Sequence, residues 1–317
     1  TKDGHQYLGV VAGASVQEYQ EDKIKKHEAT LTSRENMFME YLNIVGYNAE
    51  PVLLSYSDPE NIIEELLQSK IVERPEYEYT TTDNLKHEMW LFDSEESERL
   101  IAAFDDLDST YIADGHHRSA SSAGLRQWRE KNNEKHYPNE DQFLAFFLEE
   151  KRLHILEFNR FVKTLNGLSK SEFLLAIADK FEVSTLKKAA KPVREHQFTM
   201  CLDGDWFELN CKEELIDHEH PVKCLDAEIL TNLILEPILG ITDLKTDDNI
   251  NFLPGTLKMK KMEKKIIKGN YKVGFFLFPI EMEKIKRVAD NKMTMPPKST
   301  WIEPKLRSGL TIYNINE

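Results

Sequence analysis

The segment 111–118, Tyr-Ile-Ala-Asp-Gly-His-His-Arg, brings together residue types that suit phosphate chemistry. A short apolar strand precedes Asp114 and Gly115, and a helix is expected from about His116. The free N–H groups and the dipole at a helix N-terminus favour a bound anion. Gly115 would let the backbone approach a ligand closely, and Arg118 can donate two hydrogen bonds to a phosphate. The pattern therefore predicts an anion-binding site.

Three side chains of this segment could also take part in catalysis. Asp114, at the carboxyl end of the strand, could hold a Mg²⁺ ion that bridges phosphates. His116 and His117 can donate hydrogen bonds to phosphate or move protons near neutral pH. Adjacent helical residues point about 100° apart, so the two histidines are not expected to bind one zinc ion. A tight turn with solvated histidines is the alternative that residue types leave open.

A second group, Lys26-His27-Glu28, lies in the polar segment after the first expected strand. The carboxylate of Glu28 could act as a general base on a substrate hydroxyl. The same residues fit a solvated charge cluster before a helix, and the sequence alone favours that interpretation.

A third group lies near the C-terminus. Prolines fix the backbone beside a lysine and two hydroxyls, and two more basic residues follow: Pro296, Pro297, Lys298, Ser299, Thr300, Lys305 and Arg307. Such side chains suit phosphate or nucleotide contacts. A basic C-terminal loop without a ligand is the commoner explanation of this composition.

Charge and composition exclude several classes of protein. The net charge is −14, with 55 acidic residues along the chain, and such a surface repels nucleic acid. The basic stretch 258–268 has helical spacing and is interpreted as a solvated helix face. No apolar stretch approaches the ~18 to 20 residues of a membrane span. The three cysteines lack zinc spacing and fit a structural role in a reducing cytoplasm.

Alternating apolar strands and amphipathic helices predict an α/β (α+β) fold, a mixed sheet with helices packed around it. Thr32 with Glu35, and Asp93 with Glu96, are capping-box patterns that open helices. A hairpin is expected over 198–211, turning at Asp203-Gly204 and placing Cys201 opposite about residue 206. We expect an N-terminal region 1–165 with the Asp-Gly-His-His-Arg site and a C-terminal region 166–317, or one continuous domain.

Three separated motifs, in order, resemble the domain of unknown function 1015 family of bacterial and archaeal proteins. They are YIADGHHR, KHEATL upstream of it, and MPPKSTWIEPKLRSGL near the end, and the helix LDAEILTNLILEPILGI is also similar. The resemblance runs from about Gly9 to Leu310. Members usually carry a further N-terminal segment, and the chain begins at Thr1 without Met, so we expect a fragment.

The chain departs from the family pattern at two places. The usual aromatic residue after the arginine is Ser119 here. The Pro-Thr-His-Arg expected after the central strand is Glu157-Phe158-Asn159-Arg160, which puts a role for that second site in doubt.

The Asp-Gly-His-His-Arg motif is also similar to that of free L-serine kinases of the ParB/sulfiredoxin-like superfamily. That distant similarity implies a ParB/sulfiredoxin-like core, ATP or ADP with Mg²⁺ as cofactors, and a small hydroxy compound such as free L-serine as phosphate acceptor. By the resemblance, Glu28 would be the base and Asp114 would serve the metal or the substrate. His116, His117 and Arg118 would hold phosphates.

The sequence therefore favours a phosphate-handling enzyme, a small-molecule kinase. A nucleotide-binding regulatory or DNA-associated protein of the ParB kind is one alternative, although the acidic charge and the lack of a clear helix-turn-helix speak against it. A phosphodiesterase or nuclease that uses the histidine pair is another. The acceptor, the nucleotide, the oligomeric state and the place of the C-terminal loop stay open.

Overall fold

The computed structural model describes residues 4–317, and its contacts divide the chain into two compact units. The first unit combines Thr1–His154 with Pro304–Glu317, and the second is Ile155–Glu303. The end of the expected region 166–317 thus groups with the first unit. The division near residue 165 into separately folding domains stays a prediction.

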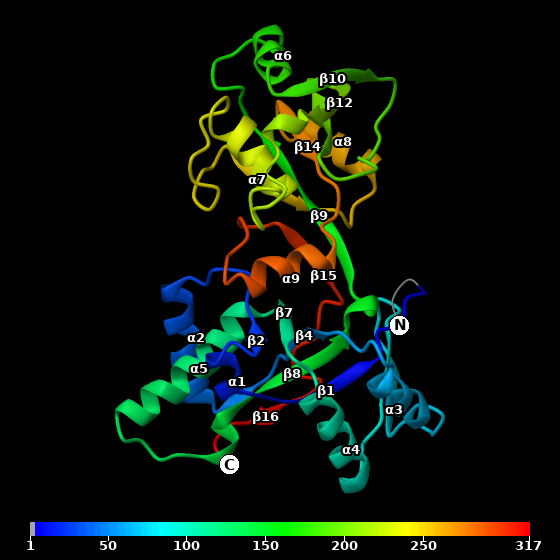
Figure 1. Cartoon of the computed structure of the whole chain (residues 1–317), viewed down its shortest axis with the longest axis vertical. Helices are drawn as coiled ribbons and strands as arrows, with labels where there is room; N and C mark the ends of the chain where they lie inside the picture. The colour runs from blue at the N-terminus through cyan, green and yellow to red at the C-terminus, as the bar shows by residue number, and fades with distance from the viewer. Residues whose placement is uncertain (1–3) are drawn as a thin grey trace. The chain divides into compact units, whose positions relative to one another are not determined.

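A mixed five-stranded sheet forms the centre of the first unit (Figure 1), in the order β1-β8-β4-β7-β2. Its strands are β1 (Gly9–Ser15), β2 (Ile24–Lys25), β4 (Val52–Tyr56), β7 (Thr110–Asp114) and β8 (Gln142–Glu149). β8 is parallel to β4 and β7 is parallel to β2, whereas the β1–β8 and β4–β7 pairs are antiparallel. The expected mixed sheet with surrounding helices is confirmed.

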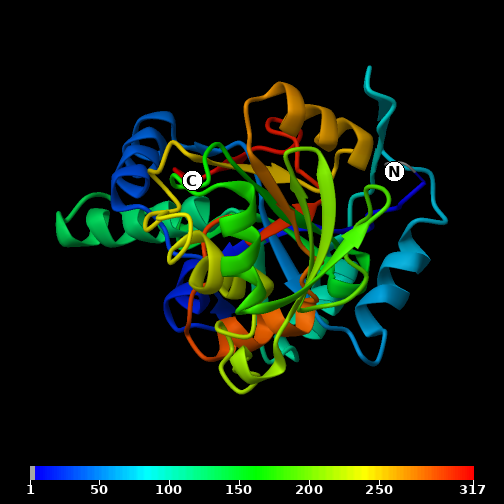
Figure 2. The same ribbon diagram turned by 90° about the horizontal axis from the view of Figure 1, so that it is seen from above.

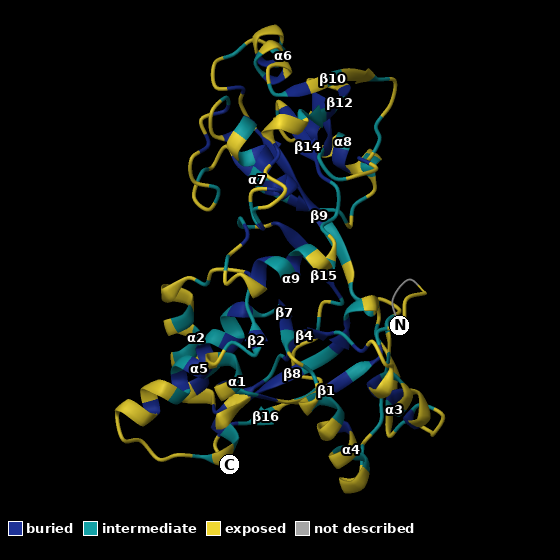
Figure 3. Cartoon of the chain, viewed as in Figure 1, coloured by how far each residue is buried: buried dark blue, intermediate teal, exposed yellow. Residues whose placement is uncertain are grey.

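The helices of the first unit follow the strands along the chain. They are α1 (Val16–Gln20), α2 (Thr32–Val45), α3 (Ile62–Lys70), α4 (Ser94–Asp105) and α5 (His116–Lys131), with short 3-10 turns at Pro138–Asp141 and Glu150–Arg152. Two small antiparallel sheets pair β3 (Tyr47–Asn48) with β16 (Tyr313–Asn314) and β5 (Tyr77–Thr80) with β6 (Lys86–Met89). Buried strands and exposed outer helix faces are distinguished in Figure 3.

The second unit is built on a larger sheet, whose strands can be followed in two views (Figures 1 and 2). In the described residues its order is β10-β12-β11-β14-β9-β13, and β15 also pairs with β9. The strands are β9 (His154–Val162), β10 (Phe181–Leu186), β11 (Gln197–Leu202), β12 (Asp205–Cys211), β13 (Ile250–Pro254), β14 (Val273–Phe276) and β15 (Thr300–Glu303).

The helices of the second unit are α6 (Lys170–Ala178), α7 (Asp226–Leu230) with the π-helical turn η4 (Thr231–Leu235), α8 (Met259–Lys268) and α9 (Met282–Asp290), with a 3-10 turn at Glu213–Leu215. Helices α6 and α7 contribute to an apolar core that includes Phe173, Phe198 and Phe275, and α8 packs in a second cluster with Phe161 and Phe276. α8 buries Met262 and Ile266. Among the described residues, no helix is long and apolar enough to cross a membrane.

Local sequence signals are confirmed where the chain itself supplies the partner. The side chain of Asp93 accepts from the N–H of Glu96, and the Glu96 carboxylate accepts from the N–H of Asp93. The hairpin turns at Asp203-Gly204, both at positive φ, and Cys201 lies opposite Trp206. A two-residue turn at positive φ matches the twist of the strands that it joins.

The capping box expected at Thr32 is wrong. The residue before α2 is Leu31, with no side-chain cap, so Thr32 is already the first helical residue and its hydroxyl cannot cap. The Glu35 carboxylate instead accepts a hydrogen bond from the hydroxyl of Thr30. The helix therefore starts one residue earlier than the Thr32–Glu35 spacing indicates.

Arg129 joins four segments of the first unit. Its guanidinium donates to the carboxylate of Glu140 at 2.6 Å and to the side-chain oxygens of Asn43 and Asn316 at 3.1 Å. Both members of the Arg129–Glu140 pair are almost fully buried. Arg129 thus ties α5 to α2, to the turn before β8 and to the C-terminal segment.

We predict that Arg129→Ala lowers the free energy of unfolding by about 3–5 kcal/mol, because it removes the 2.6 Å partner of the buried Glu140 carboxylate and leaves only the longer contact with Arg126, at 3.7 Å. Urea unfolding measures the change. Arg307→Ala is the control, since Arg307 pairs at the surface with Asp83 and its loss should cost about 1 kcal/mol or less. Equal losses for the two variants would contradict the prediction.

Candidate active site

Parallel pairing of β2 with β7 brings two of the sequence groups together. Ile24 lies opposite Thr110 and Lys25 opposite Tyr111, so both strands run the same way. The carboxyl ends of parallel strands meet at one edge of a sheet. Lys26-His27-Glu28 leaves β2 at the edge where Asp114-Gly115 leaves β7. We call this edge, with Glu28, Asp114, His116 and Arg118, the Asp114 site.

Asp114 lies between two cations. One carboxylate oxygen is 3.0 Å from the ammonium of Lys305, and the other is 3.1 Å from a guanidinium nitrogen of Arg118. The side chains of Asp114 and Lys305 are about one-third exposed, so solvent reaches this cluster. Lys305 of the C-terminal segment thus lies beside Asp114.

Arg118 also fixes the start of β4. Its guanidinium donates to the backbone oxygen of Pro51 and forms an ion pair of 2.7 Å with Glu50. A Cβ built on Gly115 would lie only 3.0 Å from Nε of Arg118, and Gly115 has a φ of +105°. Glycine is therefore needed here for the backbone conformation and for the packing of Arg118. Nothing in the sequence around Glu50 and Pro51 indicated this contact.

The helix α5 begins at His116, directly after Gly115, with no side-chain cap. Its first turn contains no acidic residue. The N–H groups of Arg118 and Ser119 are bonded to the carbonyl of Gly115. The N–H groups of His116 and His117 have no acceptor within the helix, because an α-helix leaves its first donors unpaired. The site therefore has the helix N-terminus that the sequence predicted.

His116 is buried between His27 and Glu28. The backbone N–H of His27 donates to Nε2 of His116 at 3.4 Å, and Nδ1 of His116 is 3.6 Å from a carboxylate oxygen of Glu28. The two imidazole rings meet edge to face, with centroids 4.5 Å apart. Because Nε2 accepts, the proton of the neutral ring is assigned to Nδ1, which faces Glu28. Sequence reasoning gave His27 no role, although it stands beside Glu28.

Burial keeps both imidazoles neutral. Desolvation lowers the pKa of His27 from 6.5 to about 4. Desolvation, followed by the nearby charges of His27 and His117, also holds the pKa of His116 well below its usual value. A proton placed on either ring would be poorly solvated, and a proton on His116 would also lie near the positive charges of Arg118 and Lys26. His116 is therefore a neutral ring whose Nδ1 lies 3.6 Å from the Glu28 carboxylate, rather than a cation that neutralises phosphate.

His117 points away from His116, toward α2. Desolvation, and then the charge of Arg34, lowers the pKa of His117. Its Nδ1 is buried and has no hydrogen-bond partner among the described residues. The two histidines thus lie in different surroundings. The catalytic role of His117 stays a prediction.

Lys298, Ser299 and Thr300 belong to the second unit. The ammonium of Lys298 lies 5.6 Å from the ring centroid of Phe158, and Lys298 has a φ of +57°. Ser299 is buried and donates to the carbonyl of Pro296 at 2.7 Å, and Thr300 begins β15. The nucleotide-binding role expected for these residues stays a prediction.

The Asp114 site does not offer a preformed place for Mg²⁺. Mg²⁺ prefers several oxygen ligands in octahedral geometry. Asp114 is the carboxylate proposed as its ligand, and each of its oxygens already contacts a cationic side chain. The described residues contain no group of three histidine, cysteine or acidic side chains that could hold a metal ion. The residues present do not fit a resident metal, and the metal role of Asp114 stays a prediction.

Residues 1–228 match the model of a protein family described as "Protein of unknown function (DUF1015)". The match spans most of the 317 residues. The chain belongs to this family. The resemblance drawn from the Asp-Gly-His-His-Arg segment is thereby confirmed, and the segment lies inside the matched region. No curated protein matches this DUF1015 chain.

Several solved structures show a distant similarity. A free serine kinase in complex with AMP is 15% identical, with 98% of this chain and 95% of that chain covered and a TM-score of 0.43. SbnI with C-terminal truncation from Staphylococcus aureus is 11% identical, with 96% and 87% covered and a TM-score of 0.47. A conserved hypothetical protein from Pyrococcus furiosus is 14% identical, with 98% and 97% covered and a TM-score of 0.42.

The depressed pKa of His27 makes stability depend on pH. The unfolded chain, with a pKa of 6.5, binds more protons than the folded chain, with a pKa of about 4. The free energy of unfolding should therefore fall as the pH is lowered from 6.5 to 4, by up to about 3 kcal/mol from His27 alone.

We predict that His27→Phe reduces this pH dependence, because the ring shape is kept and the titrating group is removed. Denaturant unfolding at a series of pH values from 7 to 4 measures it. If the free energy of unfolding of His27→Phe depends on pH as steeply as that of the unmodified chain, His27 is not held neutral by burial.

Proposed function

We propose that the Asp114 site transfers the terminal phosphate of ATP or ADP to the hydroxyl of a small molecule such as free L-serine. The observation that carries the proposal is the convergence of Glu28, the N-terminus of α5, Arg118 and Lys305 at one sheet edge. Phosphoryl transfer depends mainly on positioning and on neutralising charge. A carboxylate beside a helix N-terminus and two cations provides both.

Glu28 is the group proposed to take the proton from the acceptor hydroxyl. Its side chain is 42% exposed, so a substrate can reach it. The Nδ1–H of His116 faces its carboxylate, and the backbone N–H of His27 fixes the tautomer of His116. His116 therefore acts as a positioning residue for the base, because a buried neutral donor can orient a carboxylate without adding a charge.

Lys305, Arg118 and the first N–H groups of α5 are proposed to hold the phosphates. Arg118 is already engaged with Glu50, Pro51 and Asp114, so it adds a fixed charge at the edge of the site. Lys305 is partly exposed and has a flexible stem, so it can turn from Asp114 to a phosphate oxygen. Mg²⁺ would supply further charge neutralisation when it arrives with the nucleotide.

The alternative function, a phosphodiesterase or nuclease, requires two histidines that act together on one phosphate. His116 is buried against His27, whereas His117 faces Arg34 and Glu35. This geometry favours a carboxylate base over a histidine pair. A regulatory protein of the ParB kind would bind nucleotide without turning it over, and the same assay distinguishes it.

We predict formation of O-phosphoserine when the chain is incubated with L-serine, Mg²⁺ and either ATP or ADP. Mass spectrometry detects the product. Asp114→Ala is the control, because it removes the carboxylate that joins Arg118 to Lys305. If neither the unmodified chain nor the control gives product with serine or related hydroxy compounds, the kinase proposal is wrong.

For Glu28→Gln we predict a loss of turnover of about 10²–10⁴-fold, with nucleotide affinity unchanged, because the amide cannot accept the proton. Turnover comes from the same assay and affinity from isothermal titration calorimetry. Turnover near that of the unmodified chain would show that Glu28 is not the base.

For Lys305→Ala and Lys298→Ala we predict nucleotide affinity weaker by about tenfold each, the effect of losing one charge-assisted hydrogen bond. Lys131→Ala, an exposed lysine at the other end of α5, is the matched control and should bind normally. If the nucleotide affinity is unchanged in Lys298→Ala but weaker in Lys305→Ala, Lys298 does not bind the nucleotide. The proposal for the Asp114 site then still holds.

A further inference from the structure

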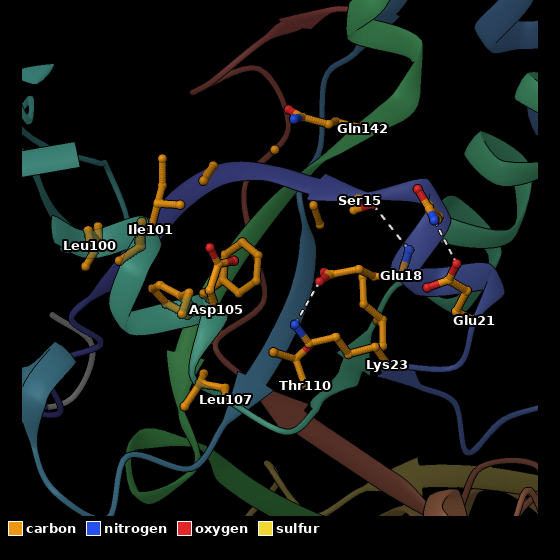
Figure 4. Close-up of a pocket in the computed structure, with 18 residues that line it drawn as sticks. Ser15, Glu18, Glu21, Lys23, Leu100, Ile101, Asp105, Leu107, Thr110 and Gln142 are labelled. Carbon is orange, nitrogen blue, oxygen red and sulfur yellow. Dashed lines mark hydrogen bonds and ion pairs between the residues drawn. The ribbon is translucent and has the colours of Figure 1, made fainter. Parts of the chain in front are cut away.

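The first unit contains a hollow that the Asp114 site does not use (Figure 4). Its volume is about 670 Å³, within the range of ligand-binding pockets. It is lined by β1, by α1, by the apolar face of α4 and by the start of β7 at Thr110. Thr110 and Asp114 are the two ends of β7, so the hollow and the Asp114 site are separated by roughly 13 Å along that strand.

The two edge strands of the sheet line this one hollow. β1 and β2 stand at opposite ends of the strand order, yet Val10, Ala12 to Ser15 and Ile24 all contribute to the lining. Residues of both edge strands therefore border one hollow, and we call the open edge of β1 beside this hollow the seam. In the described residues, β1 pairs only with β8 and β2 only with β7.

The edge of β1 lacks the features that normally protect an exposed strand. Its sequence, Gly-Val-Val-Ala-Gly-Ala-Ser, contains no charge and no proline, and Val11, Ala12 and Gly13 are exposed. Its seven residues pair with β8 in unbroken register, without a bulge. Soluble proteins blunt such edges with charges, proline or bulges, because an open edge pairs with other strands. An unprotected edge beside a hollow fits a partner strand.

The lining of the hollow indicates the chemistry of that partner. The floor and one wall are apolar and include Leu100, Phe104 and Phe147. The rim carries three carboxylates and one ammonium, from Glu18, Glu21, Asp105 and Lys23, and Lys23 is paired with Glu18 at 2.9 Å. Figure 4 shows that pair next to Thr110. The excess of negative charge complements a basic ligand.

We propose that the seam binds an extended peptide segment of a partner protein, with alternating apolar residues and basic ends, as a strand added to β1. Backbone hydrogen bonds to the edge of β1 would supply affinity, and side chains alternate between the hollow and solvent. The apolar side chains enter the hollow, and the basic ends meet the carboxylates of Glu18, Glu21 and Asp105. This proposal is independent of the phosphoryl transfer proposed above.

The test uses the peptide Lys-Val-Thr-Val-Thr-Val-Lys with the whole chain. Binding is measured by isothermal titration calorimetry, and hydrogen exchange reports protection of the amides of residues 9–15. We expect saturable binding with protection of β1. We expect at least tenfold weaker binding for the same peptide with glutamate ends and for a copy N-methylated at alternate amides.

Two variants of β1 test whether the peptide binds on the side of the strand that lines the hollow. Ala12 lines the hollow, whereas Val11, its exposed neighbour, does not. We expect Ala12→Lys to weaken peptide binding at least tenfold and Val11→Lys to change it less than twofold, with both variants equally stable. Equal effects of the two variants, or no protection of β1, would overturn the proposal.

Two further outcomes would also overturn it. N-methylated and unmodified peptides of equal affinity would show that the hollow takes side chains or a small molecule without strand addition. A dimer of the chain itself, dissociated by Ala12→Lys and unaffected by the peptide, would show that a second copy covers β1.

Discussion

The parallel pairing of β2 with β7 is the constraint on which the Asp114 site depends. β2 has only two residues, but its pairing with β7 decides where the chain leaves the sheet. Because of that register, His27 can donate its backbone N–H to His116, and Glu28 can face the same ring. A strand running the other way would release these residues at the opposite edge. The positions of His27 and Glu28 relative to His116 therefore depend on two register pairs, Ile24 with Thr110 and Lys25 with Tyr111.

Around that pairing, charges hold the edge together in a chain of contacts. Lys305 contacts Asp114, Asp114 contacts Arg118, Arg118 contacts Glu50, and Glu50 accepts from Ser308. Each link is partly exposed and weak alone, but a network of several charges holds its members better than isolated surface pairs do. The buried Arg129–Glu140 pair anchors the other end of α5. The helix is thereby fixed at both ends, which suits an element whose N-terminus is proposed to bind phosphate.

Features that depend on neighbouring residues, such as helix caps and turns, could be predicted from the sequence. Contacts between residues far apart in the chain could not. The capping box at Asp93 and the turn at Asp203-Gly204 depend on neighbouring residues, and both are confirmed. Thr32 shows the same spacing, but its helix begins one residue earlier, so spacing alone did not fix the cap. Within the site, the strand–glycine–helix pattern indicated Asp114 and Arg118. The partners of Arg118 at Glu50 and Pro51 come from a distant segment, and no local pattern indicates them.

The return of the C-terminal segment has a consequence for how the first unit is made. Pro304–Glu317 belongs to the unit formed by Thr1–His154, and Ile155–Glu303 lies between them in the chain. During synthesis the N-terminal part emerges first, and domains generally fold as units. The β3–β16 pair and the contact of Lys305 with Asp114 can form only after the whole second unit has left the ribosome. The Asp114 site is thus completed last, although most of its residues are synthesised first.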